Sequence, residues 1–230
     1  MPFSLIQKDT ARVYQGATKT FTVVPPSSAT TTNSLVVISF RFAVGSLPSN
    51  ITATDNQGNT YSLVSIKQTP STSQQGAMIY GYQKTGGVTE IYVVVTSVST
   101  PITSSSYFSE YGGYGSDLNN TVIYDKESET SSNGNETSFS VPSFNPSRVG
   151  NLIVSSLSVS GGASTLTAGA NYTRLGSGAG SSVLDGEYRL SGGASETAPM
   201  TSFTTSGGWV YITASFKDMP TGPFPTYLQN

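Results

Sequence analysis

Residues 150–162, GNLIVSSLSVSGG, repeat a pattern that first occurs at residues 33–45, NSLVVISFRFAVG. Each copy begins with a small polar residue or glycine, continues as an apolar or alternating run, and ends in glycine. Apolar and alternating runs that are bounded by turn residues predict β-strands. Because the same later landmarks follow both copies, the sequence predicts two copies of one β module.

Three later landmarks occur in the same order after each copy, and only the lengths between them differ. The matched pairs are 59–63 (NTYSL) with 171–175 (NYTRL), 79–87 (IYGYQKTGG) with 184–193 (LDGEYRLSGG), and 107–111 (YFSEY) with 212–216 (ITASF).

Short strand signals separated by turn residues recur along the chain, without a helical period. This pattern predicts an all-β fold of two tandem antiparallel β-sandwich or jelly-roll-like domains, related by internal duplication. The expected parts are an N-terminal β-sandwich with an N-terminal arm (1–124), a polar linker or loop (125–137, DKESETSSNGNET), a C-terminal β-sandwich (138–218) and a proline-rich tail (219–230).

The run 35–43, LVVISFRFA, is the strongest strand signal in the first half. Alternation along a strand places Val36, Ile38, Phe40 and Phe42 on one face. We expect that face to point into the core. Further along, 55–59 (DNQGN) predicts a turn, because Asn and Gly accept positive φ and Asp bonds to nearby backbone.

The composition argues against several functions. The net charge is -2 and 10% of residues are charged, which provides no basic surface for a nucleic-acid backbone. The chain has no cysteine and no histidine, so thiolate chemistry, disulfides and the commonest general base are absent. We expect no cofactor and no metal site.

Two acidic pairs are the candidates for acid and base chemistry. Asp185 and Glu187 are two residues apart, as are Glu127 and Glu129, so each pair would share one face of a strand. Paired glycosidase carboxylates normally come from different elements and lie in a cleft, so we expect these acids to face solvent. With no nucleophile elbow or phosphate loop, the sequence predicts a protein that is not an enzyme.

No apolar run reaches the roughly 18 to 20 residues that span a bilayer. The first residues, MPFSLIQKDT, show no export signal. Two explanations remain open: a leader was removed, or the protein leaves the cell by another route, such as release inside an assembled virion.

Four N-x-S/T sequons begin at Asn50, Asn119, Asn135 and Asn171. Each occurs at an expected turn or loop edge, where glycan acceptors are found. We expect these asparagines to be glycosylated if the host modifies surface proteins, with Asn50, Asn119 and Asn135 the best candidates.

Aromatic residues are concentrated in 107–114, where Tyr111 and Tyr114 could contact a glycan or a protein, or could belong to the core. Trp209, the only tryptophan, occurs within a strand signal and is expected to pack at the core edge of the second module.

The C-terminal segment 219–230, MPTGPFPTYLQN, combines three prolines with Phe224, Tyr227 and Leu228. Proline-rich segments lose little entropy on ordering, so this one could be an assembly arm that docks on a neighbouring subunit. The alternative is a frayed tail.

The order of GNLIV, NYTRL, YRLSGG and WVYITASFK resembles the tandem β-sandwich modules of phage and archaeal virus structural proteins and of secreted surface proteins. The resemblance covers about residues 33–217. It implies a structural protein of a virion surface, of the turret, spike, decoration or tail type, which could take part in host attachment.

Two other functions remain open: a secreted cell-surface filament or adhesin subunit, whose N-terminal arm would complement a neighbour's sheet, and a carbohydrate-binding module. The expected partners are subunits of the same assembly, as a homo-oligomer, and a host surface glycan. Nucleic acid is not expected.

Overall fold

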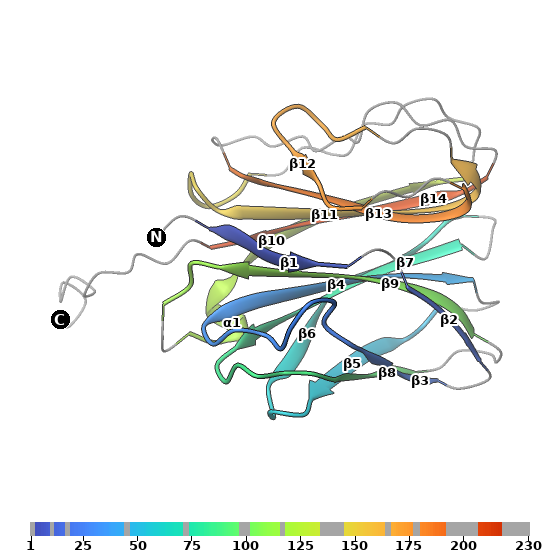
Figure 1. Cartoon of the computed structure of the whole chain (residues 1–230). Coiled ribbons are helices and arrows are strands. Elements are labelled where there is room, and N and C mark those ends of the chain that lie inside the picture. Colours follow the sequence, from blue (N-terminus) through green and yellow to red (C-terminus); the bar gives the residue numbers. More distant parts are fainter. Residues whose placement is uncertain are drawn as a thin grey trace.

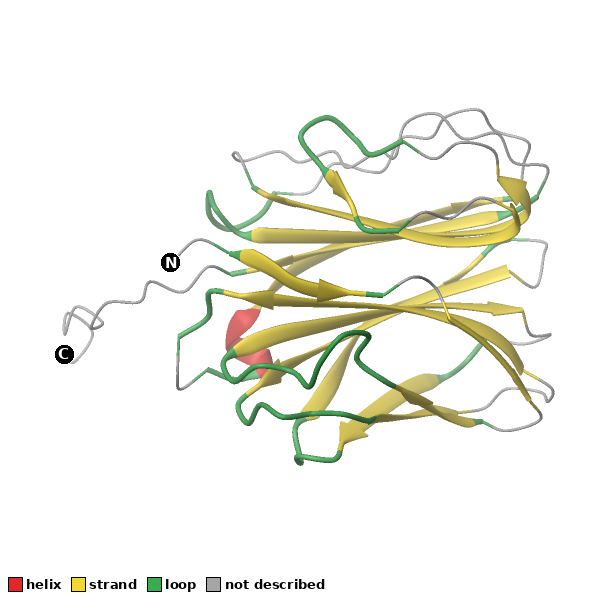
Figure 2. Ribbon diagram, viewed as in Figure 1, coloured by secondary structure: helices red, strands yellow, loops and turns green. Residues whose placement is uncertain are grey.

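The fold is all-β in the computed structural model, which describes residues 3–9, 12–16, 19–43, 47–70, 74–96, 102–115, 118–133, 145–163, 167–176, 180–191 and 207–217. Within these ranges, the only helix is a single turn, α1 (Asn120–Ile123), and strands make up most of the rest (Figure 2). The predicted all-β class is therefore confirmed.

Two antiparallel sheets contain all the strands of the described ranges. The first has nine strands, in the order β1-β9-β4-β7-β6-β5-β8-β3, with β2 also paired to β9. Their bounds are β1 (Ser4–Lys8), β2 (Arg12–Gly16), β3 (Thr20–Val23), β4 (Ser34–Ala43), β5 (Asn50–Asp55), β6 (Thr60–Gln68), β7 (Gln74–Gln83), β8 (Ile91–Thr96) and β9 (Ile102–Gly112).

The second sheet has five strands, in the order β10-β14-β11-β13-β12. Their bounds are β10 (Tyr124–Ser132), β11 (Leu152–Ala163), β12 (Thr173–Arg174), β13 (Gly180–Leu190) and β14 (Trp209–Phe216).

The strands form three layers (Figure 1). The central layer consists of β1, β2, β9, β4, β7 and most of β6, and the second sheet covers one of its faces. The small layer, β5, β8 and β3, covers the other. Strand β6 joins the central and small layers, because Thr60 and Tyr61 pair with β5 while Ser62 to Gln68 pair with β7.

Strand β4 lies in the middle of the central layer and is buried on both faces. Val36, Ile38, Phe40 and Phe42 pack toward the small layer, as expected from their alternation. The other face is buried too, with Leu35 and Val37 packed toward the second sheet. The expectation of a single inward face was wrong, because a strand covered by layers on both sides has no face left for solvent.

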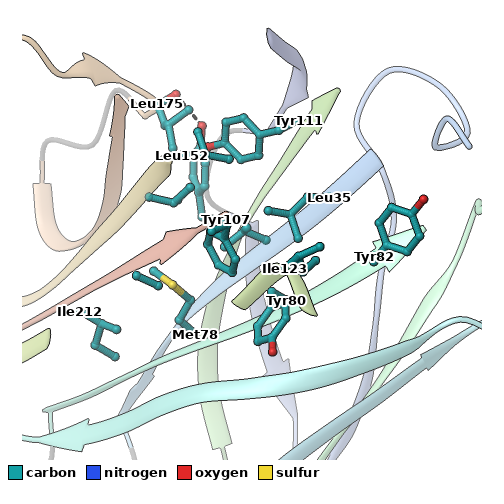
Figure 3. Close-up of a cluster of buried hydrophobic side chains, with 14 of the residues drawn as sticks. Leu35, Met78, Tyr80, Tyr82, Tyr107, Tyr111, Ile123, Leu152, Leu175 and Ile212 are labelled. Atoms are coloured by element: carbon teal, nitrogen blue, oxygen red, sulfur yellow. Dashed lines mark hydrogen bonds between the residues drawn. The ribbon is translucent and has the colours of Figure 1, made fainter. Parts of the chain in front are cut away.

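The core between the central layer and the second sheet is rich in aromatic residues (Figure 3). Its members from the central layer are Leu35, Val37, Met78, Tyr80, Tyr82, Tyr107 and Tyr111, and those from the second sheet are Leu152, Val154, Leu184, Val210, Ile212, Ala214 and Phe216. The hydroxyl of Tyr107 donates across the layers to the carbonyl of Leu175, at 2.5 Å (Figure 3). This shared core holds the two sheets together.

The polar segment predicted as a linker, 125–137, is a strand over most of its described part. Strand β10 covers Tyr124–Ser132 and pairs along its length with β14. The low hydrophobicity of this strand fits an edge position. Glu129 also forms an ion pair with Lys67 of β6, at 3.0 Å. The interpretation of 125–132 as a connection was therefore wrong. The division into two domains remains a prediction, since the sheets share one core.

Candidate functional site

The candidate site is a polar cavity of about 740 Å³ at one end of the central layer, bounded by the turn before β6, the end of β7 and the segment around α1. The residues that line it are Gln57, Gly58, Asn59, Thr60, Ser62, Tyr82, Lys84, Thr85, Leu118, Asn119, Asn120 and Thr121.

Asp55 builds one wall of this cavity by organising the predicted turn at 55–59. Its Oδ1 accepts from the backbone N–H groups of Gln57 and Asn59, both at 2.9 Å, and its Oδ2 accepts from Asn59 Nδ2, also at 2.9 Å. Gly58 has a φ of 83°, which favours glycine. Asn59 Nδ2 also donates to the carbonyl of Thr85, at 2.9 Å, and so joins the wall to the end of β7.

Asn120, the first residue of α1, ties the opposite wall to the sheet. Its side-chain oxygen accepts from the N–H of Tyr82 at 2.7 Å, and its Nδ2 donates to the carbonyl of Thr60 at 2.8 Å and to Ser62 Oγ at 3.2 Å. Both walls are therefore held by side-chain amides, and the cavity shape is set before any ligand binds.

The lining combines amides and hydroxyls with Gly58 and Leu118, and Lys84 is the only charged residue among those that line the cavity. None of the described residues that line it is an acid. Such a surface offers both donors and acceptors, which suits a hydroxyl-rich ligand. The sequence showed the turn at 55–59, but it did not show that residues 118–121 come to lie opposite it.

Three further buried carboxylates, Glu110, Asp185 and Glu187, do not line this cavity and hold other parts of the fold together. Glu110 in β9 is fully buried, and its Oε1 accepts from Thr31 N at 2.7 Å, Thr31 Oγ1 at 2.8 Å and Ser34 Oγ at 2.7 Å. Its Oε2 accepts from Gln7 Nε2 at 2.5 Å. Glu110 therefore fastens the segment before β4 and the N-terminal strand β1 to β9.

Asp185 and Glu187, predicted to face solvent, are both fully buried in β13, so that prediction was wrong. Asp185 accepts from Arg174 Nε at 2.8 Å and Nη2 at 2.5 Å, and from the N–H of Gly176 at 3.0 Å. Buried acids remain stable when charged partners and N–H donors surround them. Sequence spacing could not reveal these partners.

Glu187 lies on the same face of β13 as Asp185 and also has partners in the fold. It accepts from Gly169 N at 2.7 Å and from the Tyr211 hydroxyl at 2.8 Å. Burial raises the pKa of the Glu187 carboxyl, although both hydrogen bonds oppose the shift. The other pair differs, since Glu127 is exposed as predicted and Glu129 is half-buried beside Lys67.

Tyr111 and Tyr114, proposed as contacts for a glycan or a protein, lie in the core between the layers. Their exposed fractions are 0% and 5%, so neither ring presents a surface to a partner. Tyr111 packs against Tyr188 of the second sheet, with ring centroids 5.5 Å apart. The contact role is therefore wrong, and the core alternative holds. Trp209 is 3% exposed in β14, so it is buried within a strand as expected, but it packs in a cluster on the outer face of the second sheet and not in the core between the sheets.

Three of the four sequon asparagines are described, and all three are exposed: Asn50 at the start of β5, Asn119 before α1, and Asn171 in a turn with a φ of 67°. Asn135 lies outside the described residues. Exposure is what an acceptor requires, and the modification itself remains a prediction. Asn119 also lines the polar cavity.

The assembly-arm residues Phe224, Tyr227 and Leu228 lie outside the described residues. At the other end of the chain, strands β1 and β2 both pair with β9 of the same molecule. The N-terminal arm expected in 1–124 therefore belongs to its own central layer here.

Asp125 in β10 is a carboxylate whose charged form is stabilised by the fold. Burial opposes the charge, but hydrogen bonds from Ser147 N and Ser215 Oγ, both at 2.8 Å, and the charge of Lys217 lower the pKa of Asp125 overall. An acid with a lowered pKa stabilises the fold above its unfolded pKa, and this contribution is lost as pH falls through the folded pKa.

We therefore expect Asp125→Asn to reduce the free energy of unfolding at pH 7 by about 1–2 kcal/mol, because charged hydrogen bonds are replaced by neutral ones. The deficit should shrink as pH falls through the range where aspartate titrates, since the wild type then loses the same charge. Urea unfolding at a series of pH values measures this. A deficit that is the same at every pH would contradict the assignment.

The chain matches no protein-family model and no curated protein sequence. Among the residues that the structure describes, no helix is long and apolar enough to cross a membrane, and no group of three or more acids could hold a metal ion.

Proposed function

We propose that this chain is a non-enzymatic structural protein of a virion surface, a building block of the turret, spike, decoration or tail type. The observation that carries the proposal is the use of the buried acids. Glu110, Asp185 and Glu187 direct their oxygens to donors that fasten strands and turns, and no acid is among the described residues that line the polar cavity. These three acids stabilise a scaffold, because their oxygens are taken up by hydrogen bonds within the fold.

We also infer that the chain arose by duplication of one β unit, whose two copies pack face to face as one sandwich. The orders β1-β9-β4-β7-β6 and β10-β14-β11-β13-β12 correspond strand by strand. Leu35 of β4 pairs with Tyr82 and Tyr111, and Leu152 of β11 pairs with Leu190 and Phe216. All three matches made from the sequence fall on corresponding strands.

The two sheets also have bulges and positive-φ residues at corresponding positions. Sheets of independent origin would have no reason to share them. A bulge occurs in β1 between Leu5 and Gln7, and another in β10 between Tyr124 and Lys126. Asn33 and Gly150, at corresponding positions before β4 and β11, both have positive φ, at 60° and 88°.

A carboxylate fastens the segment before the central strand in each copy, fully buried in the first (Glu110) and half-buried in the second (Asp125). Glu110 accepts from Thr31 N and Ser34 Oγ in the first copy. Asp125 accepts from Ser147 N at 2.8 Å and Asn151 Nδ2 at 2.9 Å in the second. The acid comes from β9 in the first copy and from β10 in the second. Strand β10 is the neighbour of β14, the counterpart of β9, so adjacent strands supply the same role in the two copies. Two coupled units with well-anchored turns suit a rigid surface module.

The test of the virion assignment is the location of the protein. Antibodies raised against the chain should detect it in purified virus particles in a fixed ratio to the major capsid protein, and not on uninfected cells. Detection on the surface of uninfected cells would instead support the filament or adhesin alternative and remove the virion assignment. Sedimentation of the recombinant protein should show a homo-oligomer.

The polar cavity favours glycan binding as a second function, either in host attachment or as an independent carbohydrate-binding module. Its amides, hydroxyls and single lysine match the groups that a sugar presents, and its shape is held by Asp55 and Asn120. This site replaces Tyr111 and Tyr114, whose rings are buried.

An array of neutral and acidic oligosaccharides tests the glycan-binding hypothesis. For any oligosaccharide that binds, the double variant Gln57→Ala with Lys84→Ala should weaken binding about tenfold or more, the effect of losing one or two hydrogen bonds. Thr96→Ala, an exposed change on β8 at a residue that does not line the cavity, is the matched control. Unchanged binding by the double variant would place the glycan elsewhere.

A further inference from the structure

The two copies of the unit differ in how one end of their shared core is covered. Tyr82 and Leu190 occupy corresponding positions, because each pairs with the leucine that begins the central run of its sheet, Leu35 and Leu152 respectively. Tyr82 is 4% exposed, whereas Leu190 is 42% exposed. An apolar side chain is thus buried in one copy and open to solvent in the other.

The cover over Tyr82 comes from the segment that directly follows β9. The centroid of the Tyr114 ring lies 6.3 Å from that of the Tyr82 ring. The Tyr82 hydroxyl donates to the carbonyl of Gly115 at 2.6 Å, and the Tyr82 backbone N–H donates to Asn120 Oδ1 at 2.7 Å. A short stretch after the last strand of the first copy therefore turns back over the end of the sheet.

The chain leaves the second copy at the corresponding point. Gly112 at the end of β9 pairs with Ser4 of the neighbouring edge strand. Lys217, directly after β14, donates its N–H to the carbonyl of Ile123, at 2.7 Å, which directly precedes the edge strand β10. Lys217 of the second copy therefore corresponds to Gly112 of the first. The segment after Lys217 begins at the same place in its copy as the segment after Gly112 does.

A second exposed apolar residue belongs to the turn before β11, which meets the end of β13. Val149 is 72% exposed, the highest fraction among the large exposed hydrophobic residues of the described chain. The next residue, Gly150, donates its N–H to the carbonyl of Ser191 at 2.9 Å, which holds this turn against the end of β13. We call Leu190 and Val149 the open edge.

We propose that the C-terminal segment 219–230 docks over the open edge of its own chain, in the way that Tyr114, Gly115 and Asn120 cover Tyr82. The distance is short, because Leu190 lies two strands from β14, or about 10 Å at the usual strand spacing. Met219 and Phe224 follow Lys217 at about the separations at which Tyr114 and Leu118 follow Gly112. Three prolines lower the entropy lost when the segment is ordered.

This proposal stands apart from the proposed function. It also differs from the expectation that the segment docks on a neighbouring subunit, and the two can be separated experimentally. Because the chain has no cysteine, engineered cysteine pairs report on proximity without background.

The test is a disulfide between Leu190→Cys and Met219→Cys, introduced together into the full chain and oxidised at low protein concentration. The expected result is an intrachain disulfide, seen as an intact mass smaller by two hydrogen atoms and a faster-migrating monomer band on a non-reducing gel. Val94→Cys with Met219→Cys is the matched control, because Val94 is 41% exposed but lies in the small layer. It should remain unlinked.

Two outcomes would overturn the proposal. A disulfide that forms only between chains would mean that the open edge receives the tail of another copy. Equal yields for the Leu190 and Val94 pairs would mean that the segment has no preferred site.

A second measurement requires no disulfide. Maleimide should label Leu190→Cys several-fold faster in a chain that ends at residue 218 than in the full chain, while Val94→Cys should label equally in both. Equal labelling of Leu190→Cys in the two chains would also overturn the proposal.

Discussion

Replacing Glu110 by alanine is expected to lower the free energy of unfolding by about 3–5 kcal/mol. Its carboxylate is fully buried and accepts hydrogen bonds from Gln7, Thr31 and Ser34. Alanine would leave the buried donors Gln7 Nε2 and Ser34 Oγ without this acceptor, and would also remove the acceptor of the Thr31 N–H and hydroxyl. The same change removes side-chain hydrogen bonds that link β9 to β1 and to the segment before β4. The unfolding transition should therefore also become less cooperative.

Urea unfolding followed by far-UV circular dichroism measures the effect. Glu127→Ala is the matched control, since Glu127 is an exposed acid on the edge strand β10, and its loss should cost less than about 0.5 kcal/mol. Glu110→Gln keeps the shape and one acceptor oxygen, and should fall between alanine and wild type. A Glu110→Ala variant as stable as the Glu127→Ala variant would show that the buried carboxylate does not hold these segments.

Phe216→Ala should destabilise both sheets together, by about 3–5 kcal/mol. Phe216 is fully buried, and its ring lies 5.2 Å from that of Tyr80 in the central layer and 6.3 Å from that of Tyr124 in β10. The change would open a cavity in the core that the layers share. If that core couples the sheets, the central layer should lose stability although the substitution lies in the second sheet.

Two probes separate a coupled fold from two independent domains. Trp209, the only tryptophan, reports on the second sheet through its fluorescence, and circular dichroism reports on all strands. The two transitions should coincide in the wild type and in Phe216→Ala, with a lower midpoint in the variant. Tyr92→Ala, at a ring 43% exposed on the small layer, is the control and should shift the midpoint little. A variant with only its fluorescence transition shifted would favour the two-domain division.

The predictions from sequence succeeded where the signal was local. The runs at 35–43 and 151–159 are the central strands β4 and β11, because continuous Val, Ile, Leu and Phe favour a buried strand. The turn at 55–59 was recognisable because Asp, Asn and Gly perform its chemistry within a few residues.

The predictions failed where a residue's partners come from distant parts of the chain. Asp185 and Glu187 carry no mark in the sequence of being buried, since Arg174, Gly169 and Tyr211 supply their hydrogen bonds. The sequence of β10 resembled a linker because it is polar. An edge strand can be this polar, since its backbone hydrogen bonds to the neighbouring strand, here β14, hold it in place. The polar cavity was missed for the same reason, because the turn at 55–59 and residues 118–121 meet only after folding.

The sequence by itself determined that this protein is helix-poor and β-rich, and that it carries neither cysteine nor histidine. These properties follow from residue type and local order. Only the tertiary structure decided which faces are buried, where each acid lies and which strands share a core. Burial depends on which layer comes to lie over each side chain, and neighbours brought together by folding are separated by many residues along the chain.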